Sequence, residues 1–278
     1  MNILIQTCLY NEETSINLFL QYYNSLINDI GSGTIIFIDF GCTDYTIKRI
    51  KQFRFHPTVK IEIINNYTTE HREDILMLYR NHYWKRLKNN FDYVFIVDVD
   101  EIVHDDDLIN NLTSGVDCLL SEGVDVVTNH FKVISKRVKK CEDIKLFYRN
   151  VKFFKNLNKI NVFNPKTFHP NFYDGCHLAK PICKLPFNIK PTYLLHFKHI
   201  GYKLFIKIAK EKSNRSLTHS NTFNHGYHYT LNKDYTERKY NDESNSNLID
   251  ITGRPPNLVP EFTPTFYSVI ENYKNMFT

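Results

Sequence analysis

The first half of the chain alternates short apolar runs with longer amphipathic stretches, and this alternation limits the fold more than any other feature. Apolar runs rich in β-branched residues begin near residues 2, 34, 60 and 93. Between them, apolar residues recur at helical spacing, as Ile16, Phe19, Tyr23 and Ile27 do. Strands that alternate with helices predict a parallel sheet covered by helices. We therefore expect an α/β protein with a Rossmann-like, mostly parallel central sheet and helices on both of its faces.

The same patterns give approximate bounds for the individual elements. The expected strands cover residues 2–8, 34–39, 60–65, 93–97, 124–133, 162–163 and 193–197. The expected helices cover residues 16–30, 43–53, 73–89, 108–120, 204–215 and 267–276. Thr43 is the expected N-cap of the second helix. Four prolines between residues 255 and 264 predict an extended segment before the last helix.

Composition narrows the class of protein. The six cysteines include no C-x-x-C pair, so they indicate neither a zinc site nor a disulfide framework. No run approaches eighteen apolar residues, and the first strand begins almost at Met1, which leaves no room for a signal peptide. We expect a cytoplasmic protein without a membrane span. The net charge of +5 suits an anionic small substrate and does not indicate a nucleic-acid partner.

The strongest candidate site follows the apolar run at residues 93–97. Asp98 and Asp100 lie two residues apart, so an extended backbone would point both carboxylates to one face. The carboxyl edge of an open α/β sheet is where such folds bind ligands. Oxygen ligands suit Mg²⁺ or Mn²⁺, which would offset the charge on a leaving diphosphate. The alternative is that these are ordinary loop acids, as we expect for residues 105–107.

Three motifs at strand ends resemble those of the family 2-like glycosyltransferases of GT-A fold. They are TCLYNEE after the first strand, IDFGCTDYT after the second and IVDVDE after the fourth. The segments NPKTFHPNFYDGCHLAKP and YLLHFKHIG are similar to the later part of some family members. The resemblance implies a GT-A domain over residues 1–200, with a nucleotide-binding half at 1–110 and an acceptor-side half at 111–200. Residues 201–278 would then form a C-terminal helical and proline-rich strap.

The family motifs assign donor-binding roles to several positions. The residues that the resemblance places beside the base, ribose or metal are Leu9, Asn11, Glu12, Asp39, Asp98 and Asp100. Thr43 falls on the second motif, where it is either a donor contact or a helix cap. Arg80 and Asn81 reproduce an R-N pair of the family. Arg80 would reach a phosphate, hold Asp98, or form only a surface salt bridge.

The acceptor side offers weaker candidates. An acceptor hydroxyl needs a general base, and Asp174 in FYDGCH is the first candidate, with His177 second. A plain turn residue before Gly175 is the other interpretation of Asp174. His196 in LLHFKH is a candidate third ligand to the cation, and Lys198 or His199 is a candidate contact to the diphosphate. A structural histidine is the other interpretation of His196.

These features predict a metal-dependent glycosyltransferase. It would use Mn²⁺ or Mg²⁺ and a nucleotide-diphosphate sugar, with a UDP-sugar as the expected donor, and a glycan, glycoprotein or lipid-linked acceptor. Inversion at the sugar carbon is implied by the resemblance. One alternative is a nucleotidyltransferase, although such enzymes open with a glycine-rich phosphate loop where this chain has TCLYNEE. The other alternative is a carbohydrate-binding protein without turnover.

Overall fold

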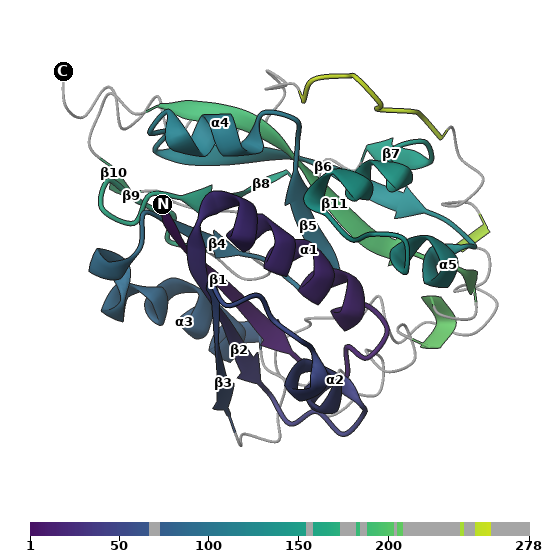
Figure 1. Ribbon diagram of the computed structural model, residues 1–278, viewed down its shortest axis with the longest axis horizontal. Helices are drawn as coiled ribbons and strands as arrows, with labels where there is room; N and C mark the ends of the chain where they lie inside the picture. The colour runs from purple at the N-terminus through teal and green to yellow at the C-terminus, as the bar shows by residue number, and fades with distance from the viewer. Residues whose placement is uncertain are drawn as a thin grey trace.

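A nine-stranded sheet with helices on both faces forms the body of the protein (Figure 1). The computed structural model describes residues 1–66, 73–153, 158–172, 182–183, 188–202, 205–207, 240–241 and 248–256. The sheet has the order β3-β2-β1-β4-β8-β6-β11-β5, and β7 pairs with β6 outside this path. A second sheet contains only β9 and β10.

The strands of the large sheet are β1 (Asn2–Leu9), β2 (Ser32–Asp39), β3 (Val59–Asn65), β4 (Tyr93–Ile96), β5 (Glu101–His104), β6 (Cys118–Val127), β7 (Val151–Phe153), β8 (Lys159–Phe163) and β11 (Ile189–His199). The small sheet is β9 (Phe168–His169) and β10 (Ile182–Cys183). The α-helices are α1 (Ile16–Ile30), α2 (Thr46–Gln52), α3 (Glu73–His82), α4 (Leu108–Thr113) and α5 (Phe131–Ser135). The 3₁₀-helices are η1 (Trp84–Arg86), η2 (Lys88–Asn90) and η3 (Cys141–Phe147).

Six of the nine strands run in one direction. The strands β3, β2, β1 and β4 are mutually parallel, and β6 runs parallel to β11. The strand β8 is antiparallel to both β4 and β6, which gives these two groups the same direction. The other two strands, β5 and β7, also run in reverse. The prediction of a mostly parallel α/β sheet is therefore confirmed.

Alternate residues of the central strands pack into two separate hydrophobic cores, one on each face of the sheet. Ile3 and Ile5 of β1 pack with helix α1, whereas Leu4 packs on the opposite face with Leu76 of α3 and with Trp84. Successive side chains of a strand point to opposite faces, so a strand covered on both sides reads as one continuous apolar run. This arrangement confirms the expected helices on both faces of the sheet.

The link between β4 and β5 requires the sheet to curl. Three strands separate β4 from β5 in the sheet order, although only residues 97–100 connect them. Four strand spacings of about 4.8 Å amount to roughly 19 Å. The five Cα steps from Ile96 to Glu101 reach at most about 18 Å when extended. A turn closed by the hydrogen bond from the Glu101 N–H to the Asp98 carbonyl (3.0 Å) shortens this further. The sheet therefore bends back on itself around this link.

Several expected elements in the middle of the chain differ from the structure. The helix expected at 108–120 ends at Thr113, where Gly115 adopts a φ of +78° suited to a helix terminus. The following residues form β6, and the strand expected at 124–133 therefore ends at Val127. A short buried apolar run has no periodicity that separates a strand from a helix, which explains this error. The helix expected at 73–89 ends at His82 and continues as η1 and η2.

Most of the predicted C-terminal strap lies outside the described residues. Of the helix expected at 204–215, the structure describes residues 205–207, which are helical. The helix expected at 267–276 lies outside the described part of the chain, so the strap and the division into domains stay predictions. Among the helices that the structure describes, none combines the length and apolar character needed to cross a bilayer.

Candidate functional site

The loops after β1 and β2 are joined through Asn11. Its side-chain Oδ1 atom accepts hydrogen bonds from the backbone N–H of Thr43 (2.8 Å), the hydroxyl of Thr43 (3.3 Å) and the N–H of Asp44 (3.3 Å). Asn11 has a φ of +55°, a left-handed conformation that asparagine tolerates better than most residues. Its own N–H donates to the Cys42 sulfur (3.3 Å). Asn11 therefore fixes one loop against the other.

Asp39 closes the loop that follows β2. Its Oδ1 atom accepts the N–H groups of Gly41 (3.1 Å) and Cys42 (2.8 Å). Gly41 has a φ of +90°, a conformation that favours glycine. Gly41 therefore allows this turn.

Asp44 takes the capping role that we expected of Thr43. Helix α2 begins at Thr46, and its N-cap residue Tyr45 makes no side-chain cap. The two carboxylate oxygens of Asp44 accept the N–H of Thr46 (2.9 Å) and the N–H of Glu13 (3.0 Å). Thr43 is therefore not the cap of this helix, and its contact with the first loop is the role that the structure shows.

The predicted acidic pair lies on a tight turn rather than on extended backbone. The strand β4 ends at Ile96, and the hydrogen bond from the Glu101 N–H to the Asp98 carbonyl (3.0 Å) closes the turn. The argument that an extended backbone aligns the two carboxylates is therefore wrong. Their expected position just beyond a buried parallel strand is correct.

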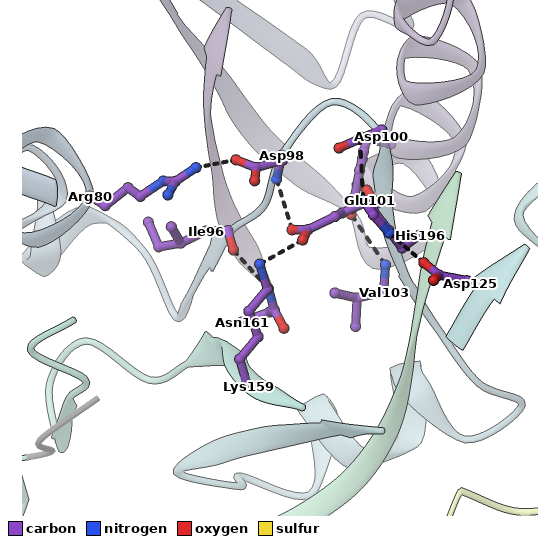
Figure 2. Close-up of polar contacts among 11 residues, drawn as sticks. Arg80, Ile96, Asp98, Asp100, Glu101, Val103, Asp125, Lys159, Asn161 and His196 are labelled. Carbon is purple, nitrogen blue, oxygen red and sulfur yellow. Dashed lines mark hydrogen bonds and ion pairs between the residues drawn. The ribbon is translucent and has the colours of Figure 1, made fainter. Parts of the chain in front are cut away.

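Arg80 pairs with Asp98 (Figure 2). The Arg80 side chain is 10% exposed and the Asp98 side chain 38% exposed, so this is not the surface salt bridge that the sequence left open. The Arg80 carbonyl accepts the indole N–H of Trp84 (3.0 Å), and Asn81 exchanges two hydrogen bonds of 2.7 Å with the backbone of Phe172. These contacts hold the end of α3 in place, and with it the guanidinium that faces Asp98.

Asp100 belongs to a second charged group, which His196 joins to Asp125 (Figure 2). His196 Nε2 lies 3.4 Å from an Asp100 oxygen, and Nδ1 lies 2.6 Å from an Asp125 oxygen. Burial alone would lower the pKa of His196, but the charges and hydrogen bonds of Asp100 and Asp125 outweigh burial and raise the pKa to about 10. At neutral pH the imidazole is therefore protonated and donates to a carboxylate on each side.

Asp125 was not among the predicted site residues. It enters the site because β6 pairs with β11 in a register that places Asp125 opposite His196. An aspartate buried inside a ten-residue strand was the available signal, since such a charge requires a partner. The strand expected at 124–133 includes Asp125, but its pairing with β11 was not predicted.

Lys159 and Glu101 form a buried ion pair beneath the turn. The Lys159 Nζ atom lies 2.6 Å from Glu101 Oε1, and the two side chains are 5% and 3% exposed. Burial alone would lower the pKa of Lys159, but the charges of Glu101 and Asp98 outweigh burial and raise the pKa above its ordinary value. Lys159 is therefore protonated at neutral pH. Lys159 is the last residue of the stretch 136–159, whose many lysines and aromatic residues predict a solvated face or a binding patch, and neither interpretation predicts a buried ion pair.

The residues present fit a divalent cation in part. Asp98 and Asp100 supply carboxylate oxygens on one turn, and their side chains are 38% and 19% exposed, so a hard cation could reach them. A metal-binding histidine needs one ring nitrogen directed at the ion. Both ring nitrogens of His196 face carboxylates, so His196 is not arranged as the third metal ligand. Among the described residues, no group of three or more His, Cys, Asp or Glu side chains is arranged to hold a metal ion. A cation here would take its remaining ligands from water and substrate.

The remaining predicted residues differ in burial and in how much of them the structure describes. The Leu9 side chain is buried in the core, and its carbonyl accepts the Phe40 N–H (3.0 Å), so this side chain is not positioned to contact a nucleotide. Glu12 is half-buried at the start of the first loop. Asp174 and His177 lie outside the described residues. For Lys198 the structure describes only the backbone, which is part of β11.

Comparisons with known proteins find similarity only among solved structures. No protein-family model and no curated protein matches the sequence. The structure of S. aureus TarS is similar over 44% of this chain and 22% of that chain, at 17% identity and a TM-score of 0.33. S. aureus TarS 1–349 in complex with UDP-GlcNAc is similar over 44% of this chain and 35% of that chain, at 15% identity and a TM-score of 0.31. The chain spans less than two fifths of the length of either structure.

Proposed function

We propose that this protein is a metal-dependent glycosyltransferase that transfers a sugar from a nucleotide-diphosphate donor, a UDP-sugar, to an acceptor hydroxyl. The observation that carries the proposal is the position of the Asp98–Asp100 turn beside the loops after β1 and β2. The strands β2, β1 and β4 are adjacent and parallel, so their carboxyl ends meet at one edge of the sheet. Ligands of open α/β sheets bind at such an edge.

Each group at this edge has a part in the proposal. Asn11, Glu12, Asp39 and Thr43 would face the nucleoside, and Lys198 the diphosphate. Asp98 and Asp100 would hold Mn²⁺ or Mg²⁺, and the protonated His196 would orient Asp100 without binding the ion. A bound cation supplies charge neutralisation for the leaving diphosphate.

The charged neighbours of the acidic pair would keep both carboxylates oriented before the donor arrives. Arg80 holds Asp98, and the protonated His196 holds Asp100. Groups that are already oriented need no rearrangement when charge develops in the transition state. The three cations Arg80, Lys159 and His196 are each already paired with a carboxylate, so the bound metal ion would supply the charge that offsets the diphosphate.

A screen of nucleotides by thermal unfolding in the presence of Mn²⁺ tests the proposal. We expect UDP with Mn²⁺ to raise the melting temperature. A ligand at 100 times its dissociation constant adds about 2.7 kcal/mol of stability, which corresponds to a shift of several degrees for a protein of this size. The matching nucleotide sugar should then be hydrolysed slowly without an acceptor. If no nucleoside diphosphate stabilises the protein, the proposal is wrong.

The Asp174→Asn variant tests the proposed acceptor base. A hydroxyl needs a base to become a good nucleophile, and the loss of a general base lowers turnover by roughly 100- to 10,000-fold. We expect kcat to fall by this amount with the donor KM unchanged, because the donor would bind on the other side of the site. Steady-state kinetics of Asp174→Asn, with His177→Gln beside it, distinguish the two candidates. Full activity in both variants would exclude both residues.

A further inference from the structure

The buried ion pair of Lys159 and Glu101 lies directly below the Asp98–Asp100 turn and is bonded to it. We infer that these two residues form a positioning pair that sets the conformation of the Asp98–Asp100 turn and thereby controls how the turn binds its cation. Neither residue would touch substrate. The inference rests on the proposed function, because it assigns the turn a task in catalysis.

Burial makes the pair hard to explain by stability alone. Charges taken out of water lose their hydration, and their mutual attraction often only offsets that loss. An apolar pair of similar volume would serve the core equally well or better. Lys159 and Glu101 begin two different strands, β8 and β5, and are joined across 58 positions of sequence. Their contact therefore fixes the relative position of two strand ends.

Glu101 divides its two oxygens between the lysine and the turn. Oε1 binds Lys159 Nζ (2.6 Å), while Oε2 accepts the backbone N–H of Asp98 (3.0 Å). The Glu101 N–H in turn donates to the Asp98 carbonyl (3.0 Å). Asp98 is thus held by two hydrogen bonds from one residue, and Lys159 fixes the orientation of the carboxylate that makes one of them (Figure 2).

The strand β8 also holds the other end of the link. The Nδ2 atom of Asn161 donates to the carbonyl of Ile96 (3.0 Å), the last residue of β4. The pairing of β8 with β6 is irregular between Ile160 and Val162, so the regular alternation of side chains is broken at Asn161. Lys159 and Asn161 of β8 nevertheless hold residues 97–100 at both ends, through Ile96 at the start and Glu101 at the finish (Figure 2).

The loss of Lys159 would disturb the charge balance around the turn. Four acids, Asp98, Asp100, Asp125 and Glu101, face three cations, Arg80, His196 and Lys159. The charge of Lys159 also acts on Asp98. Without it, Glu101 would be an unpaired carboxylate buried next to the acidic pair and would lose the contact that fixes its orientation. This change alters the backbone support of Asp98.

The double variant Lys159→Met/Glu101→Gln tests the inference. Lys159→Met by itself leaves a buried charge unpaired and can unfold the protein, whereas the double variant removes both charges and keeps similar volume. We expect the double variant to unfold near the wild-type temperature. We expect a 10- to 100-fold weaker affinity for Mn²⁺ in the presence of UDP, since the groups behind metal ligands have effects of about this size. Electron paramagnetic resonance of bound Mn²⁺ measures it.

Two further readouts separate a positioning role from a structural one. Hydrogen exchange at the Asp98 amide should become faster in the double variant, because its acceptor is no longer held by a lysine. The single variant Lys159→Arg, which keeps a positive charge beside Glu101, should keep most of the Mn²⁺ affinity of the wild-type protein. The control is Lys166→Met, which removes an exposed lysine that pairs with Asp92 (3.4 Å) and should change neither readout.

The outcomes distinguish this inference from the proposed function. If wild-type protein binds Mn²⁺ and UDP, and the folded double variant matches it in Mn²⁺ affinity and in exchange at Asp98, the pair is structural and the inference is overturned. If wild-type protein binds neither Mn²⁺ nor a nucleoside diphosphate, the proposed function fails first. Faster exchange together with weaker Mn²⁺ binding supports the inference.

Discussion

Asp100→Asn is expected to lower kcat/KM by roughly 100- to 1000-fold, the usual loss when one group that stabilises developing charge is removed. The substitution keeps the shape of the side chain but removes the charge that would hold the cation. Steady-state kinetics over a range of Mn²⁺ concentrations measure the effect. An increase in the Mn²⁺ concentration needed for half-maximal activity would accompany the loss.

The fold should survive this change. The Asp100 carbonyl keeps its hydrogen bond from the Phe197 N–H (2.8 Å), and His196 keeps Asp125 as its partner. We therefore expect the stability to change by no more than about 1 kcal/mol, as for most partly exposed sites. Asp107→Asn, at an exposed carboxylate that precedes α4, is the matched control and should retain activity. Normal turnover in Asp100→Asn would exclude the metal role of this residue.

Trp84→Ala is expected to destabilise the protein by about 3–5 kcal/mol, the range for large aromatic residues removed from a core. The Trp84 side chain is 1% exposed, and its ring lies 4.9 Å from that of Phe163 and 5.4 Å from that of His169, centroid to centroid. Its indole N–H donates to the Arg80 carbonyl. Urea unfolding measures the loss of stability.

The same variant should also weaken donor binding at temperatures where it remains folded. Arg80 would lose its backbone anchor, and the pairing with Asp98 depends on the position of that residue. Trp84→Phe separates the two effects, because it keeps most of the packing and loses only the N–H. We expect it to cost about 1 kcal/mol for the hydrogen bond, in addition to a smaller packing loss. A loss below 1 kcal/mol in Trp84→Ala would contradict the packing argument.

The elements that could be predicted are those marked by a continuous apolar run or by apolar residues at helical spacing, because these signals lie within the element itself. The expected strands at 2–8, 34–39 and 60–65 match β1, β2 and β3 to within two residues. The strand β5 could not be found, because EIVH is four residues long and its place depends on pairing with β11, which is distant in sequence. The spacing of apolar residues within a short segment does not show which distant segment it pairs with.

The site shows the same division. The position of Asp98 and Asp100 follows from an apolar run that ends in acids, which is a local signal. Lys159 and Asp125 enter the site through the pairing of β8 with β6 and of β6 with β11, so no spacing in the sequence marks them. Arg80 was identified with three possible roles, and its contact with Asp98 in the structure decides among them.

The shortness of the connection at residues 97–100 has a mechanical consequence. A long loop would let the two acids adjust to a ligand independently of the strands on either side. Four residues leave no spare length, so any rotation of β5 and β11 relative to β1 and β4 moves the carboxylates with it. Under the proposed function, a donor bound at the carboxyl ends of β1 and β2 and any ligand bound against β5 or β11 would therefore act on the same two side chains, without a separate moving part.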